Sequence, residues 1–172
     1  LDEGKYTLLV APRATMTEIK FAVEQIFDEL MDTMPRHGAY RLNAQEYYYP
    51  ASTVKLPVTL LALQRINELK ISGLDKNTTM LTGAAYSGQT EVWNDPAASD
   101  GRPTIAQYIK KILLVSDNDA FNRIYEWIGQ KEINESMAKK GFKDVRLIHR
   151  LQLPMPPEEN RHTNAVQFLD ES

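Results

Sequence analysis

A serine and a lysine three residues apart, Ser52 and Lys55, are the residues whose types and spacing most suggest chemistry in this sequence. They stand at the head of the apolar run PASTVKLPVTLLAL, which predicts a helix over about 52–71. Side chains three positions apart on a helix share one face, so the hydroxyl and the amine are expected within hydrogen-bond reach. The pair therefore suggests a serine nucleophile with an amine as its proton acceptor.

The apolar neighbours of Lys55 suggest how a lysine can serve as a base. Leu56, Val58 and Leu60 are expected to surround the ammonium and keep water away from it, and poor solvation of the charged form lowers a lysine pKa. Ser52 is also placed at the start of the predicted helix, where free N–H groups and the helix dipole favour a developing anion.

Ordinary explanations compete with this interpretation. Ser-x-x-Lys arises by chance about once in a chain of this size, and a second copy, Ser136 to Lys139, lies on a polar segment expected to be a solvated helix face. A serine before a helix is usually a cap, and a lysine stem often extends past apolar residues to water. The histidines lie in no recognisable nucleophile motif, and no H-E-x-x-H metal motif is present.

A second motif, Ser-Asp-Asn at 116–118, adds support for a catalytic role of Ser52 and Lys55. Ser116, Asp117 and Asn118 fall in the break between two predicted helices, 104–115 and 120–129, where short polar side chains can project into a groove. The competing interpretation is a turn in which Asp117 or Asp119 caps the following helix.

With these two motifs in this order, the sequence resembles the class A β-lactamase-like group of penicillin-recognising serine hydrolases. The matching residues are PASTVKLP and LLVSDNDAFNRIYEWIG, and the similarity of layout covers roughly 39–165. The resemblance implies that Ser52 is the acylated nucleophile and Lys55 its proton acceptor or relay. It implies that Ser116 passes a proton toward the leaving nitrogen. It also implies that Asn118 holds the helical subdomain against the catalytic helix and contacts the substrate amide or Lys55. No metal or organic cofactor is implied.

The resemblance also implies the fold. We expect an α+β fold of the β-lactamase/transpeptidase type, a mostly helical lobe with a partial antiparallel sheet, as a single domain over 1–172 with a helical subdomain at roughly 53–142. The patterns along the chain add a helix over 15–34 and another over 131–141. Weak strands are expected at Tyr6–Val10 and 145–149, and the tail from Leu151 reads as a long ordered loop.

Two departures from the family pattern bear on activity. The Lys-Thr/Ser-Gly strand of the family is absent from the sequence, which leads to the expectation that the chain is a fragment or that another chain completes the site. Gln152 follows Arg150 where class A enzymes carry a glutamate that activates water, and a glutamine amide cannot act as a base at neutral pH. Glu158 or Glu159 is a possible substitute in a shortened loop.

Three functions follow from these observations. The first is a serine hydrolase acylated at Ser52 by a β-lactam or a related cell-wall amide and then hydrolysed. The second is a non-catalytic member of the same fold that binds a ligand or partner, and the third is a helical interaction module in which both motifs are accidental.

Composition limits the partners. A net charge of −3 and a pI near 5.7 provide no basic field for nucleic acid or an anionic membrane, and no apolar stretch is long enough to span a bilayer. The chain has no cysteine, which is compatible with an oxidising compartment. By the family resemblance, the small-molecule β-lactam or peptidoglycan-like substrate implies a periplasmic or secreted protein.

Overall fold

The computed structural model describes residues 46–86 and 88–169. The chain divides into two compact units, Leu1–Tyr47 and Tyr48–Ser172, and the elements described below all belong to the second. The helix expected over 15–34 and the strand expected at Tyr6–Val10 lie outside the described residues. The assignment of one domain with a helical subdomain stays a prediction.

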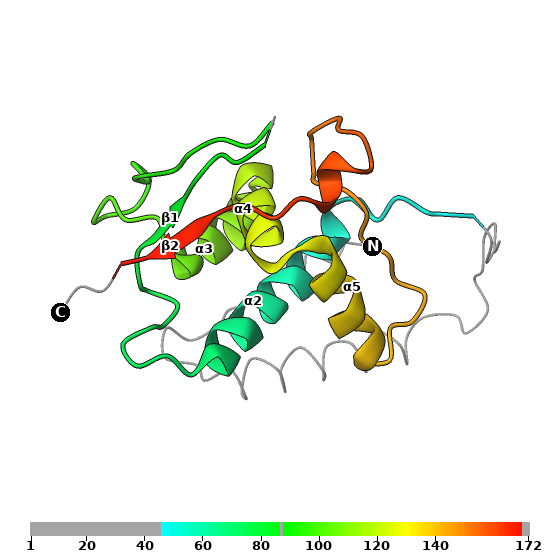
Figure 1. Ribbon diagram of the computed structural model, residues 1–172, viewed down its shortest axis with the longest axis horizontal. Helices are drawn as coiled ribbons and strands as arrows, with labels where there is room; N and C mark the ends of the chain where they lie inside the picture. The colour runs from blue at the N-terminus through cyan, green and yellow to red at the C-terminus, as the bar shows by residue number, and fades with distance from the viewer. Residues whose placement is uncertain (1–45, 87, 170–172) are drawn as a thin grey trace, which may run out of the picture. The chain divides into compact units, whose positions relative to one another are not determined.

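Helices make up most of the regular secondary structure of the described chain (Figure 1). The three later helices agree with the sequence prediction to within two residues at each end, but the predicted helix over 52–71 is a 3-10 turn followed by an α-helix. That helix ends early because Lys70 adopts a left-handed backbone conformation, with φ 50°. The helical elements are η1 (Ala51–Val54), α2 (Lys55–Leu69), α3 (Ile105–Val115), α4 (Asn118–Ile128), α5 (Gln130–Lys139) and η2 (Glu159–Arg161).

The core forms around α4, against which α2, α3 and α5 all pack. Phe121, Ile124 and Tyr125 of α4 are fully buried, and burying an apolar side chain of this size stabilises the fold by about 1.5–3 kcal/mol. Although α2 carries a long apolar run, it is not enclosed on all sides, because Leu56 and Leu60 are 37% and 41% exposed.

A small antiparallel sheet completes the described fold. Strand β1 (Met80–Thr82) pairs with β2 (Val166–Phe168), and Met80 faces Phe168 in the register. Figure 1 shows β2, the last element described, alongside β1. Among the described residues the fold is therefore α+β and mostly helical, which confirms the predicted class in this coarse form.

One strand prediction and one loop prediction were wrong. Residues 145–149 form no strand, because the side-chain amide of Asn134 takes the place of a neighbouring strand: its Oδ1 accepts from the Leu147 N–H at 2.7 Å and its Nδ2 donates to the Leu147 carbonyl at 2.7 Å. The tail is not loop throughout, because it contains η2 and supplies β2.

Candidate active site

Ser52 lies in the single 3-10 turn that precedes α2 and is exposed to solvent. Residues at i and i+3 of a 3-10 turn eclipse one another, so Ser52 and Lys55 lie on the same side of the chain, as the sequence predicted for an α-helix. The Lys55 backbone N–H donates to the Ser52 carbonyl and closes the turn. Before the serine, Ala51 has a φ of 48°, a conformation that residues with a Cβ rarely adopt.

Lys55 is almost fully buried, with 4% of its surface exposed. Its ammonium donates to the Ser116 carbonyl at 2.5 Å, to Ser116 Oγ at 2.8 Å and to Asn118 Oδ1 at 2.6 Å. Three acceptors match the three N–H groups of an ammonium. The site thus joins Lys55 to both residues that sequence analysis selected from the second motif.

Burial lowers the pKa of Lys55 from its ordinary value, and the negative charge of Asp117 opposes part of that shift. The expected apolar surroundings are only partly present. Val58 is 1% exposed, whereas Leu56 and Leu60 are 37% and 41% exposed. The polar corner after α3 contributes to the burial of Lys55, which gives the amine hydrogen-bond partners as well as poor solvation.

The corner between α3 and α4 presents residues 116–118. Ser116 ends α3 in the left-handed conformation, with φ 56°, and Asn118 is the first residue of α4. Asp117 caps α4 by accepting from the Ala120 N–H at 2.9 Å, and its carboxylate lies 3.6 Å from Lys111 Nζ. The capping explanation for Asp117 is therefore correct, and it coexists with the contacts that its two neighbours make to Lys55.

A hydroxyl contact links the exposed serine to this corner. Ser116 Oγ donates to Ser52 Oγ at 3.5 Å, the outer limit of a hydrogen bond. Ser116 therefore contacts both the exposed hydroxyl of Ser52 and the buried amine of Lys55. Catalytic hydrogen bonds are often long before substrate binds and tighten afterwards, so this geometry is compatible with proton transfer.

Gln152 extends the site on its other side, a contact that sequence analysis did not find. Its Oε1 accepts from Asn118 Nδ2 at 2.9 Å. Gln152 and Asn118 lie far apart in the sequence, and no local pattern connects them. The structure gives no contact of the Glu158 or Glu159 carboxylate with Ser52, Lys55 or Ser116 among the described residues, so their suggested role stays a prediction.

Unusual backbone conformations gather at this site. Among the described residues, the non-glycine positions with positive φ are Ala51, Lys70, Ser116 and Gln152. All but Lys70 belong to the candidate site or adjoin Ser52. Backbone strain of this kind persists only where the surrounding structure enforces it, and it concentrates at functional sites.

The loop that carries Gln152 is held at its base by a buried ion pair. Arg150 Nε lies 2.8 Å from Glu126 Oε1, and the two side chains are 0% and 3% exposed. The rest of the guanidinium donates to the carbonyls of Glu159 and His162 at 2.9 and 2.8 Å. Arg150, at the start of this loop, therefore connects α4 to Glu159 and His162 at its end.

The second Ser-x-x-Lys copy has no comparable surroundings. Ser136 Oγ donates to Glu132 Oε1 at 3.0 Å along α5, and Lys139 is exposed. These contacts agree with the prediction of a solvated helix face.

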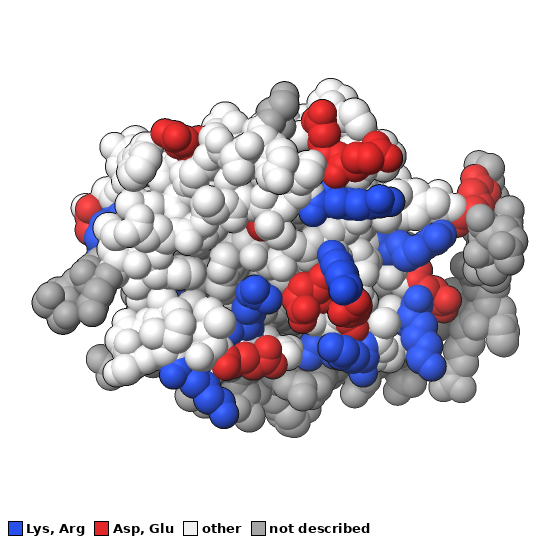
Figure 2. Space-filling view, in the orientation of Figure 1, with Lys and Arg blue, Asp and Glu red and all other residues white. Residues whose placement is uncertain are grey.

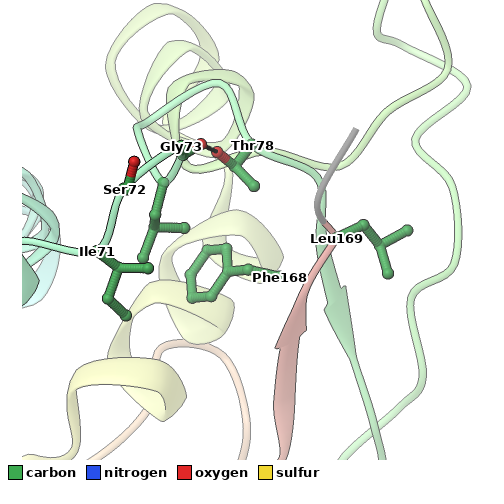
Figure 3. A pocket seen from close by; sticks show the side chains of 7 residues that line it. Ile71, Ser72, Gly73, Thr78, Phe168 and Leu169 are labelled. Atoms are coloured by element: carbon green, nitrogen blue, oxygen red, sulfur yellow. Dashed lines mark hydrogen bonds between the residues drawn. The ribbon is translucent and has the colours of Figure 1, made fainter. Parts of the chain in front are cut away.

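A cavity of about 240 Å³ lies at the far end of α2 (Figure 3). Its lining includes Ile71, Leu74 and Phe168, and Thr78 Oγ1 donates to the Gly73 carbonyl at 3.4 Å on its wall. With a rise of about 1.5 Å per residue, α2 separates this cavity from Lys55 by about 20 Å. The cavity is therefore distinct from the candidate active site.

Comparison with known proteins supports the class that this fold and site indicate. The sequence matches the model of the beta-lactamase enzyme family over residues 19–169. The chain belongs to this family.

Matches to curated proteins are short and concern ribosomal proteins. The chain is similar to the large ribosomal subunit protein uL23 of Paenarthrobacter aurescens (strain TC1), 44% identical over 63 residues, which are 35% of this chain and 62% of that protein. It is also similar to uL23 of Arthrobacter sp. (strain FB24), 56% identical over 41 residues, 22% of this chain and 41% of that protein. The chain thus spans less than two thirds of either relative.

Within the described residues, no helix combines the length and apolar character needed to cross a lipid bilayer.

Proposed function

We propose that this protein is a serine hydrolase that is acylated at Ser52 by a β-lactam or a related cell-wall amide and then releases the acyl group to water. The observation that carries the proposal is a buried lysine whose amine contacts Ser116 and Asn118 beside an exposed serine. Family membership supports hydrolase chemistry, and the residue roles below belong to the proposal.

Acylation begins with Lys55 as the neutral amine. The Ser52 oxygen attacks the carbonyl carbon of the amide while its proton passes to Ser116 Oγ, and the Ser116 proton passes to Lys55 Nζ. The proton then returns through Ser116 to the amide nitrogen, and the carbon–nitrogen bond breaks. Asn118 binds the amide of the substrate through its side chain. Backbone N–H groups at the start of η1 favour the oxyanion, because the first amides of a helical turn have no partner within it.

Hydrolysis of the acyl-enzyme is expected to be slow. Water must attack the ester carbonyl of acylated Ser52, and Gln152, the side chain in contact with Asn118, cannot accept its proton. The product acid then leaves and the Ser52 hydroxyl is regenerated. The proposed activity is therefore efficient acylation followed by slow turnover.

A non-catalytic member of the fold is the alternative. The observation that favours it is the set of three acceptors around Lys55, which suits a charged ammonium that cannot take a proton. Such a protein binds a β-lactam or partner reversibly and without a covalent bond.

A role in the ribosome, which the names of the curated relatives raise, has less support. Affinity for nucleic acid depends on an excess of Lys and Arg, whereas this chain carries a net charge of −3. On the face drawn in Figure 2, cations and anions are interspersed.

A substrate in the cell wall would place the protein in the periplasm or outside the cell.

Incubation with a penicillin tests the proposal. The intact mass is expected to rise by the mass of one penicillin, because ring opening adds the whole molecule to Ser52. The Ser52→Ala variant is expected to show no increase, whereas Ser136→Ala, which alters the second motif copy, should be labelled like the wild type. Saturable binding without a mass increase would support the non-catalytic alternative instead.

A further inference from the structure

The Asn118 side-chain amide lies between two partners of different kinds. Its oxygen accepts from Lys55 Nζ at 2.6 Å, and its nitrogen donates to Gln152 Oε1 at 2.9 Å. An ammonium can only donate hydrogen bonds, so the Asn118 side chain has to turn its oxygen toward Lys55. Its amino group then points the other way and needs a hydrogen-bond acceptor there. Gln152 provides that acceptor.

Helix α4 also fixes the position of Gln152. Asn122, one turn after Asn118, donates through Nδ2 to the Leu151 carbonyl and accepts through Oδ1 from the Leu151 N–H, both at 2.9 Å. The residue before Gln152 is therefore clamped to the helix that presents Asn118. Side chains four residues apart on a helix lie on one face. The hydrogen bonds from Asn122 to Leu151 and from Asn118 to Gln152 are therefore made by the same face of α4.

The backbone at Gln152 is in a conformation that glycine would adopt more readily. Its φ is 62°, in the left-handed region, yet the residue has a long side chain. A glutamine held there needs a compensating contact. The hydrogen bond to Asn118 is such a contact.

We propose that Gln152 is a positioning residue that holds the Asn118 amide with its oxygen toward Lys55 and its amino group toward the loop. The inference rests on the proposed function and adds a role for the residue that replaces the expected base. Gln152 acts on the nucleophile only through Asn118 and Lys55. Without it, the amide is free to rotate and the charged form of Lys55 loses an acceptor.

The consequence is a shift in the protonation of Lys55. A hydrogen bond to the charged form favours that form, so removing the acceptor lowers the pKa of Lys55. Acylation needs the neutral amine, and its rate therefore rises with pH through the pKa of Lys55. In Gln152→Gly this rise is expected about one pH unit lower than in the wild type. In Gln152→Glu it is expected at higher pH, because the carboxylate still accepts from Asn118 and adds a negative charge.

The experiment measures the rate of acylation by a fluorescent penicillin against pH for the wild type and these two variants. Gln152→Gly also relieves the positive φ, so its melting temperature should not fall, which separates the effect from loss of folding. Leu153→Ala, a change in the next side chain of the same loop, is the control and should leave the pH profile unchanged. Shifts of opposite sign in the two Gln152 variants support the proposal, and profiles that coincide with the wild type overturn it.

A second measurement separates this inference from the proposed function. The titration of Lys55, followed by NMR of protein labelled at the lysine side-chain carbons, needs no acylation. If the wild type forms no adduct at Ser52, the proposed function fails, yet the Lys55 midpoint should still move down in Gln152→Gly and up in Gln152→Glu. A Lys55 midpoint that is the same in all three proteins overturns the positioning role, whether or not acylation occurs.

Discussion

Lys55→Arg should lower the rate of acylation by penicillin about 10²–10⁴-fold. This is the range that a positioned acid or base contributes. Arginine keeps a positive charge and several donors for Ser116 and Asn118, but its guanidinium stays protonated and cannot accept the Ser52 proton. Lys55→Met should lose activity to a similar degree, because it removes the base without adding a charge. Stopped-flow measurement with a fluorescent penicillin gives the rates.

Lys111 supplies a matched control. Its Nζ lies 3.6 Å from the Asp117 carboxylate and 3.4 Å from that of Asp95, so it contacts the same corner from outside the site. Lys111→Met should retain acylation within a few fold of the wild type. Equal losses in the Lys55 and Lys111 variants would mean that the corner needs both cations for its structure, and the proton-acceptor role of Lys55 would be wrong.

Arg150→Ala is expected to lower the free energy of unfolding by about 3–5 kcal/mol, since it leaves the buried carboxylate of Glu126 without its ion-pair partner. It also removes the donors to the carbonyls of Glu159 and His162, so the loop bearing Gln152 loses its anchor. Urea unfolding followed by circular dichroism measures the change.

Two further variants show whether the loss comes from the buried pair. Arg102→Ala breaks an ion pair of the same 2.8 Å length that lies at the surface, and it should cost far less. Adding Glu126→Gln to Arg150→Ala should recover part of the stability, because a neutral amide is less costly to bury than an unpaired carboxylate. If Arg150→Ala and Arg102→Ala destabilise the protein equally, the assigned role of the buried pair is wrong.

The local parts of this site were predictable from sequence. Ser-x-x-Lys at a helix start brings Ser52 and Lys55 to one side through the geometry of a single turn, and a polar triplet between two helical patterns has to form a corner. The helices themselves follow from apolar periodicity, and the fold class was implied by the family resemblance.

The contacts between distant segments were not predictable from such patterns. Lys55 was expected to be buried by Leu56, Val58 and Leu60, but packing leaves Leu56 and Leu60 37% and 41% exposed. The Asn118–Gln152 hydrogen bond depends on a loop whose position is set by Asn122 and Arg150. Strand β2 is three residues long and pairs with a strand far earlier in the chain, so it leaves no periodic signal.

The titration of Lys55 in the free wild-type protein tests the central claim most directly, because the proposed chemistry requires a neutral amine at this position. NMR of protein labelled at the lysine side-chain carbons, with the signal assigned from Lys55→Met, gives the midpoint. We predict a midpoint below 10.5, the ordinary value, because burial disfavours the charged form more than Asp117 restores it. A midpoint at or above 10.5 would show an amine held as a permanent cation and would contradict its role as the proton acceptor of Ser52.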